Sequence, residues 1–192
     1  MVCDCAASKI KSMKTIFLSI LLALNASAAD VKVFFSPKGG CTEAVVENVG
    51  KAKFTVLVQA YSFTSAPIAK ALVDASKRGV NVQVILDKSQ RTEKYSGADF
   101  LLHEGVPTFI DAKHAIAHNK IMVIDSHTIL TGSFNFTKAA EENNAENLLV
   151  IDDDALAKKY TSNWQNHFDH SAPYTDEKGT MADTRPKRKR KK

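Results

Sequence analysis

The 192-residue sequence is poor in cysteine, and two of its three cysteines lie close to the N-terminus. Cys3 and Cys5 fall in a segment that we expect to be removed, which leaves Cys41 alone in the mature chain. A single cysteine excludes an internal disulfide bond in the mature monomer. Stability must therefore come from a hydrophobic core, and the remaining length is sufficient for one domain with such a core.

The sequence also lacks a long apolar segment. The apolar run from Ile16 to Leu24 is shorter than the roughly 20 residues of an ordinary membrane span. It follows Lys14 and precedes the small residues 26–28, which is the pattern of a secretory signal peptide. We therefore predict that residues 1–28 are an N-terminal extension and signal peptide, and that the mature protein is periplasmic or secreted. An uncleaved N-terminal anchor is the alternative.

Positive charge is scarce outside the end of the chain. The formal net charge is +5, yet the part between the leader and the tail has slightly more acidic than basic residues. We predict that residues 173–192 form a disordered basic tail, because like charges repel and apolar residues to bury are few. The tail is interpreted either as a tether to nucleic acid or an anionic membrane, or as a solvated terminus. Its clustered cations are Arg185, Lys187, Arg188, Lys189, Arg190, Lys191 and Lys192.

Apolar segments of strand and helix character alternate between these two ends. The predicted strands cover 31–35, 54–60, 80–86, 107–110, 120–124, 128–131 and 148–151. The predicted helices cover 42–49, 65–77, 97–104 and 152–168. This order, with a hairpin in the middle, predicts an α/β domain over residues 29–172, with a mixed β-sheet sandwiched between helices. No internal repeat is present.

Two residues at the start of the 120–124 strand suit phosphate chemistry. His118 and Lys120 stand two positions apart, which places both side chains on one face of a strand. A lysine can neutralise a phosphate oxygen before a nucleophile attacks the anion. An imidazole is a competent nucleophile at neutral pH without the help of a metal. We predict His118 as the nucleophile and Lys120 as a catalytic, phosphate-binding residue, with no metal and no cofactor.

Further polar residues follow at fixed positions. Ser133 and Asn135 can hydrogen-bond other phosphate oxygens, and we predict both as catalytic and phosphate-binding; turn formation beside Gly132 is the alternative role. Asp125 stands at the far end of the same strand, on the face opposite Lys120. We therefore predict that Asp125 and Gly132 give structural support, Asp125 by capping a turn or forming an ion pair.

These residues together resemble the signature of the phospholipase D superfamily, and the likeness extends over the mature domain in length and strand order. The chain is most similar to the short bacterial endonucleases of that superfamily, which carry one signature per chain and act as homodimers. The larger phospholipases carry two signatures, and this chain has room for one. The matching pattern is His118-x-Lys120-x4-Asp125-x6-Gly132-Ser133-x-Asn135.

A nucleophilic histidine needs its second ring nitrogen held, which fixes the tautomer and raises basicity. Glu146 is our candidate for this task. The resemblance supports the choice, because the family has an acidic residue at about this distance after the Gly-Ser turn. A surface charge is the alternative interpretation of Glu146.

One histidine cannot both attack phosphorus and protonate the leaving oxygen on the other side. A chain with one motif therefore needs a second copy, and a two-fold symmetric dimer brings the same residue of each chain together. We predict a homodimer in which one His118 attacks and the other donates a proton. The expected path is a phosphohistidine intermediate followed by hydrolysis.

The sequence does not determine whether the phosphodiester substrate is a nucleic acid or a lipid. The small size, the single motif and the basic tail favour a sequence-nonspecific endonuclease acting on DNA, with RNA as a further substrate. A lipid phosphodiesterase is the first alternative, although no amphipathic helix or aromatic cluster suggests a place for acyl chains. A non-catalytic nucleic-acid-binding module is the second.

The other histidines receive structural interpretations. A metal-ligand pair of His114 with His118 is disfavoured, because the segment between them is not expected to be helical. His167 and His170 are interpreted as partners of the dipole at the end of the last helix. The residues 61–63 follow a buried strand and are candidates to line the cleft.

Overall fold

The structure is a computed structural model, and it describes residues 29–93, 96–176 and 179. The predicted signal peptide and most of the predicted tail, residues 177–178 and 180–192, fall outside the described residues. Within the described part, no helix combines the length and the apolar character needed to cross a membrane.

Eight strands form one mixed sheet in the order β1-β7-β6-β5-β2-β3-β4-β8. Three neighbouring strands, β2, β3 and β4, are parallel, and the other neighbours pair antiparallel. The predicted α/β class with a mixed sheet is confirmed. The strands are β1 (Asp30–Ser36), β2 (Thr55–Ala60), β3 (Asn81–Asp87), β4 (Thr108–Asp111), β5 (Lys120–Ile124), β6 (Thr128–Gly132), β7 (Glu146–Asp152) and β8 (Ala172–Pro173).

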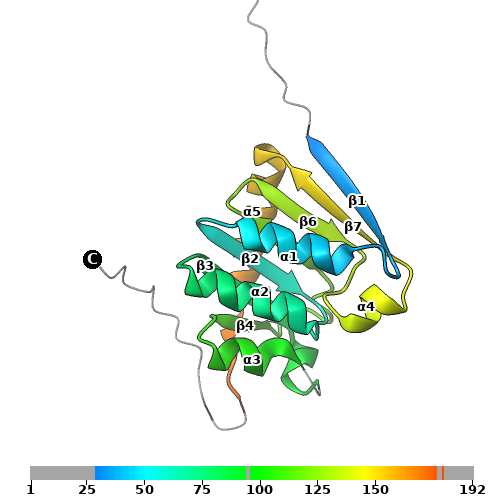
Figure 1. The fold of residues 1–192 in the computed structure, drawn as a ribbon. Helices are drawn as coiled ribbons and strands as arrows, with labels where there is room; N and C mark the ends of the chain where they lie inside the picture. Colours follow the sequence, from blue (N-terminus) through cyan, green and yellow to red (C-terminus); the bar gives the residue numbers. More distant parts are fainter. Residues whose placement is uncertain (1–28, 94–95, 177–178, 180–192) are drawn as a thin grey trace, which may run out of the picture.

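Helices cover both faces of the sheet, as Figure 1 shows. The helices α1 (Cys41–Lys51), α2 (Ala66–Lys77) and α3 (Gly97–His103) lie in front of it, and α5 (Asp154–Phe168) lies behind. Two short elements complete the described fold: a 3-10 turn, η1 (Lys88–Arg91), and α4 (Lys138–Glu142). The result is a three-layer sandwich with the sheet in the middle.

Each face of the sheet has its own core. The larger core joins α1, α2 and α3 to the sheet, mainly through aliphatic side chains that follow the predicted apolar periodicity. On the other face, Trp164 of α5 is fully buried and stacks on Phe168. The Trp164 indole N–H donates to the backbone oxygen of Val58 at 2.9 Å, which fixes α5 across the sheet.

The predicted elements agree with the observed ones to within a few residues at their ends, but the short elements η1, α4 and β8 were not predicted. The described fold also continues past 172, the predicted end of the domain. Tyr174 is buried, its backbone N–H donates to Thr108 O at 2.8 Å, and its hydroxyl donates to Asp99 at 2.7 Å. These contacts attach the segment after α5 to β4 and α3.

The first residue of α1 is Cys41, one residue before the predicted start of this helix. The helix begins after Gly40, whose φ of 83° lies in the left-handed region, and the Thr42 amide donates to the Glu141 carboxylate at 2.7 Å. Glu141 belongs to α4, so the amide in the first turn of α1 is capped by a residue far along the chain. Cys41, the cysteine of the described chain, is fully buried there, and burial together with Glu141 raises the pKa of its thiol to about 11.

The topology brings several chain segments to one edge of the sheet. The last residue of β2, Ala60, faces the first residue of β5, Lys120. The end of β6 at Gly132 and the start of β7 at Glu146 lie at the same edge, because both strands run antiparallel to their neighbours. The carboxyl ends of β3 and β4 complete this edge. Such an edge is where ligands bind in many α/β proteins.

Candidate active site

His118 and Lys120 lie at this edge, beside the ring of Tyr61. Lys120 is buried, with 7% of its surface exposed, whereas His118 is exposed. The Lys120 ammonium donates to the backbone oxygen of His118 at 2.8 Å and lies 5.1 Å from the centre of the Tyr61 ring. The His118 and Tyr61 rings are 4.6 Å apart. The structure therefore brings together the predicted nucleophile and the predicted phosphate-binding cation.

Tyr61 is held in place by the backbone. Its N–H donates to Asn119 O at 3.0 Å, which extends the pairing of β2 with β5 past the end of the strand. The ring consequently lies beside both the Lys120 ammonium and the His118 imidazole. The sequence placed Tyr61 only among candidates for lining the cleft, because its contacts with the motif depend on strand pairing that a sequence does not display.

Glu146 supplies the negative charge near this cation. Burial lowers the pKa of Lys120, and the negative charge of Glu146 opposes that shift. Glu146 is half-buried at the start of β7; its backbone N–H donates to Ser36 Oγ at 3.2 Å, and its carboxylate accepts from Asn144 Nδ2 at 3.3 Å. Glu146 thus balances Lys120 in this structure, while its predicted contact with the imidazole of His118 stays a prediction.

The turn after β6 is built around Gly132. Its φ is 152°, and a Cβ atom there would lie 2.3 Å from the backbone oxygen of Asn147, so the close approach requires glycine. The Ser133 amide donates to Asn147 Oδ1 at 2.9 Å, and Ser133 Oγ accepts from the Asn147 amide at 3.0 Å. Asn147 is a positioning residue that the sequence interpretation missed, because nothing in its local sequence separates it from neighbouring asparagines.

Asn135 follows this turn and is half-buried. Its side-chain oxygen is buried and has no hydrogen-bond partner, although its backbone oxygen accepts from the Thr137 amide at 2.7 Å. A buried polar atom without a partner is costly and marks a place where a ligand can supply one. This fits the predicted participation of the Asn135 amide in substrate binding.

Asp125 lies at the opposite edge of the sheet. Its carboxylate accepts hydrogen bonds from the backbone amides of Lys53, Phe54 and Thr55, each at 2.8 Å. Its own backbone has φ 52°, a conformation that Asp and Asn tolerate better than most residues. Asp125 therefore closes the connection from α1 to β2 and lies at the far end of β5 from His118.

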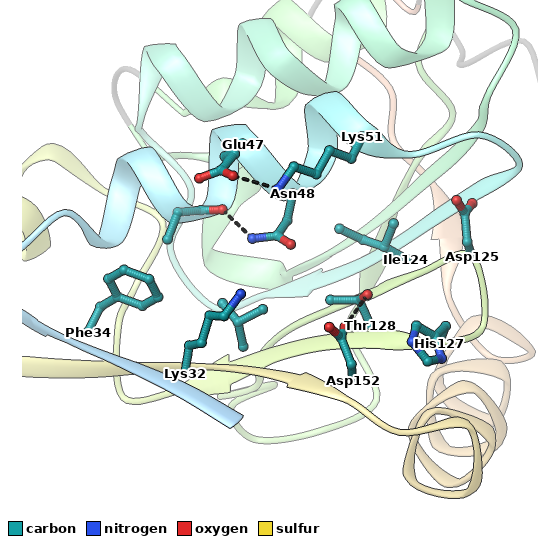
Figure 2. Close-up of a pocket in the computed structure, with 12 residues that line it drawn as sticks. Lys32, Phe34, Glu47, Asn48, Lys51, Ile124, Asp125, His127, Thr128 and Asp152 are labelled. Atoms are coloured by element: carbon teal, nitrogen blue, oxygen red, sulfur yellow. Dashed lines mark hydrogen bonds and ion pairs between the residues drawn. The ribbon is translucent and has the colours of Figure 1, made fainter. Parts of the chain in front are cut away.

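A pocket of about 270 Å³ opens at this opposite edge (Figure 2). Two pairs of its polar side chains contact each other: Glu47 pairs with Lys51, and the Thr128 hydroxyl donates to Asp152 at 2.6 Å. Asp125 and His127 line its rim. The pocket is thus separated from the predicted nucleophile by the length of β5.

Three other histidines meet in a cluster that the sequence interpretation did not include. His114 gathers with His167 and His170 around the Asp111 carboxylate, where His167 and His170 were interpreted as partners of the helix dipole. Within the described chain, this is the cluster whose side chains could hold a metal ion. His118 is not a member of it.

Comparison with known proteins gives consistent relationships. The family described as "Cardiolipin synthase, PLD-like domain" matches residues 45–168. A protein of Rickettsia conorii named phospholipase D is 41% identical over 140 residues, which cover 73% of this chain and 70% of that protein. A mitochondrial cardiolipin hydrolase of Xenopus laevis is 32% identical over 115 residues, covering 60% of this chain and 55% of that protein.

Two solved structures share the fold. Nuc from Salmonella typhimurium, a phospholipase D family member, aligns with a TM-score of 0.74 and 37% identity, over 77% of this chain and 99% of its own. NucT from Helicobacter pylori aligns with a TM-score of 0.70 and 27% identity, over 77% of this chain and all of its own. With the matching family and the placement of His118 and Lys120 at one sheet edge, these relationships show that the chain belongs to the Nuc-like branch of the phospholipase D superfamily.

Proposed function

We propose that this phosphodiesterase is a sequence-nonspecific endonuclease that cleaves nucleic acid through a phosphohistidine intermediate, without using a metal in the chemical step. The observation that carries the proposal is the arrangement of an exposed His118 imidazole beside a buried Lys120 ammonium at the open edge of the sheet. A phosphate placed there meets a cation and a nucleophile together.

The proposed reaction has two steps. A ring nitrogen of His118 attacks phosphorus, a P–N bond forms, and the P–O bond to the leaving oxygen breaks as that oxygen takes a proton. Water then attacks phosphorus and gives a proton to the group that protonated the leaving oxygen, the P–N bond breaks, and the phosphate product leaves with the imidazole restored. Lys120 balances the charge on the phosphate oxygens in both steps, and the Asn135 side chain and the Ser133 hydroxyl bind the phosphate from the other side.

The proton for the leaving oxygen is proposed to come from His118 of a second chain. In the described chain, His118 is the imidazole next to Lys120, while the reaction uses a nucleophile and an acid on opposite sides of phosphorus. A two-fold homodimer supplies both from one sequence. Light scattering tests this step: a monomer with full activity would contradict it.

Nucleic acid is preferred over lipid as the substrate on two grounds. Nuc and NucT match over 99% and 100% of their own length, and residues 185–192 form a cluster of basic residues. The names of the Rickettsia and Xenopus relatives favour the other candidate, a lipid phosphodiesterase. Both substrates present the same phosphodiester to His118.

The test compares the wild-type protein with His118→Ala on three substrates: plasmid DNA, phosphatidylcholine vesicles and cardiolipin-containing vesicles. His127→Ala is the matched control, because His127 lies exposed at the other edge of the sheet. Nicking by wild type and His127→Ala, but not by His118→Ala, supports the endonuclease. Headgroup release without nicking gives the lipid enzyme, and binding of DNA without cleavage gives the non-catalytic module. Quenching with an alkaline denaturant, in which the P–N bond is stable, should trap a phosphohistidine from labelled substrate in the wild type.

The predicted leader and tail remain proposals. We propose that a signal peptide ending at residue 28 directs the protein to the periplasm or out of the cell; N-terminal sequencing of the mature protein tests this. We propose that the cations of residues 185–192 tether the enzyme to nucleic acid. Deletion of these residues should reduce the salt dependence of DNA binding.

A further inference from the structure

Four titratable side chains converge at the carboxyl end of β4, outside the site built around His118. The carboxylate of Asp111, the last residue of β4, is fully buried. Its Oδ2 atom lies 2.9 Å from His114 Nδ1 and 2.8 Å from His167 Nδ1, and its Oδ1 atom lies 3.3 Å from His170 Nε2. The Lys113 amide donates to the same Oδ1 at 3.1 Å.

The cluster is unusual for a structural ion pair, because three imidazoles share one carboxylate. Their ring centres lie 4.8 to 5.6 Å apart, so protonation of all three would place like charges side by side. His170 Nε2 is buried and makes no hydrogen bond of suitable geometry, although it points at Asp111. One buried nitrogen is thus aimed at the centre of the group without a satisfactory partner.

We propose that Asp111, His114, His167 and His170 bind one divalent transition-metal ion, Zn²⁺ in the first instance. The four ligand atoms lie within 4.8 Å of one another. Tetrahedral Zn²⁺ with bonds of about 2.0–2.2 Å to nitrogen and oxygen needs ligand atoms roughly 3.4 Å apart, so shifts of about 1 Å or less complete the sphere. Three imidazole nitrogens and one carboxylate oxygen are a donor set that Zn²⁺ accepts.

Metal binding replaces the hydrogen bonds that hold the cluster now. Each imidazole binds through a nitrogen without a proton, so the Nδ1 atoms of His114 and His167 lose any proton that faces Asp111: a neutral ring carries it on Nε2 instead, and an imidazolium releases it to solvent. An ion can reach the group, since the His114 side chain is 42% exposed and the Asp111 carboxylate lies behind it. The Lys113 amide holds the carboxylate as an outer hydrogen-bond donor, as metal-ligating carboxylates commonly require.

The proposed ion would join two distant parts of the chain. His114 belongs to the loop between β4 and β5, which leads to His118, whereas His167 and His170 lie at the end of α5 and just after it. The same loop is already attached to β3 and η1: the Ala117 amide donates to Asp87 at 2.7 Å, and Lys88 Nζ donates to His114 O at 3.1 Å. The role of the ion is structural, because none of its ligands is His118 or Lys120.

The experiment uses the full chain without an affinity tag, stripped with a chelator and dialysed. Titration with Zn²⁺ should give one bound ion per chain. Titration with Co²⁺ should give the visible absorption bands of a tetrahedral site. At a hundredfold excess over the dissociation constant, Zn²⁺ should raise the melting temperature by about 5–10 °C.

Two variants locate the site, and two controls accompany them. His114→Ala and His170→Ala should each weaken Zn²⁺ binding at least tenfold, and circular dichroism verifies that they fold. His127→Ala, which removes an exposed imidazole elsewhere, and His118→Ala should bind as the wild type does. Absence of stoichiometric binding to the wild type at micromolar Zn²⁺, or unchanged affinity in both cluster variants, overturns the proposal.

Hydrogen exchange gives a second readout that does not depend on activity. Zn²⁺ should slow exchange of the amides in residues 112–117 of the wild type, because the ion fixes this loop to the end of α5. The same addition should leave exchange unchanged in His170→Ala. Slowing of equal size in both proteins would contradict the assignment of the ligands.

Discussion

At the start of β5 the imidazole of His118 is exposed beside Tyr61, whereas at its end the carboxylate of Asp125 accepts hydrogen bonds from three backbone amides. Both residues belong to one short motif, and five residues of strand separate their surroundings. The first end presents groups that a substrate can still engage, and the second end has its polar atoms engaged by the protein. A motif can thus combine a reactive site with the support of the fold that carries it.

The largest expected effect lies at the reactive end. His118→Ala should lower phosphodiesterase activity about 10⁴-fold or more, because it removes the nucleophile. The free energy of unfolding should change by less than about 0.5 kcal/mol, since the side chain is exposed. Initial rates and urea unfolding measure the two quantities. Substantial activity in this variant would show that His118 is not the nucleophile, and the start of β5 would then not be the reactive end of the strand.

Lys120→Met should lower activity by about 10²- to 10⁴-fold, because it removes the cation that balances the phosphate. Stability should hold or rise by up to about 1 kcal/mol, since burial lowers the pKa of Lys120 and the folded protein therefore disfavours its charge. Lys120→Arg is the matched control for charge. Strong destabilisation by Lys120→Met would show that the ammonium supports the fold as Asp125 does.

At the other end, Asp125→Asn should lower the free energy of unfolding by about 1–3 kcal/mol, since one amide oxygen cannot replace a carboxylate that serves three amides. Asparagine tolerates the positive φ, so the loss isolates the hydrogen bonds. Activity below the unfolding transition should stay within about threefold of wild type. A selective loss of activity without a loss of stability would move Asp125 into the catalytic machinery.

The smallest effect concerns pH. Burial raises the pKa of Asp125, but the amides of Thr55, Lys53 and Phe54 outweigh it, so the net pKa is lowered. A lowered pKa in the folded state adds stability above the unfolded value of about 4, and this stability is lost as pH falls through the folded value. The free energy of unfolding, measured with urea between pH 7 and pH 3, should therefore fall less steeply with pH for Asp125→Asn than for wild type. The same dependence on pH in both proteins would contradict a lowered pKa of Asp125 in the folded state.

Much of the fold followed from local patterns. The two strands of the central hairpin were predicted because apolar runs flank the polar turn after Ile124, and the structure has both within one residue of their expected ends. The short helix α4 was not predicted, since its five residues are mostly polar and too few to show a helical period. Its position depends on Glu141, whose carboxylate contacts the start of α1.

The site was predictable where its residues are close in sequence. His118, Lys120, Ser133 and Asn135 have fixed spacing, so their pattern is visible without a structure. The cluster around Asp111 has its members in two segments far apart in the chain. Only the antiparallel pairing of β8 with β4, and the packing of α5 behind the sheet, bring His167 and His170 to Asp111. Such contacts leave no local signature.

The buried thiol of Cys41 offers a built-in reporter. At neutral pH it stays protonated, because its pKa is raised to about 11, and its side chain is fully enclosed at the first residue of α1. A thiol-specific dye should therefore label Cys41 of the folded protein at the rate at which α1 opens, since the reagent cannot reach this sulfur before that. Cys41, which has no partner for a disulfide bond in the mature domain, thus reports the rate of local opening of the fold.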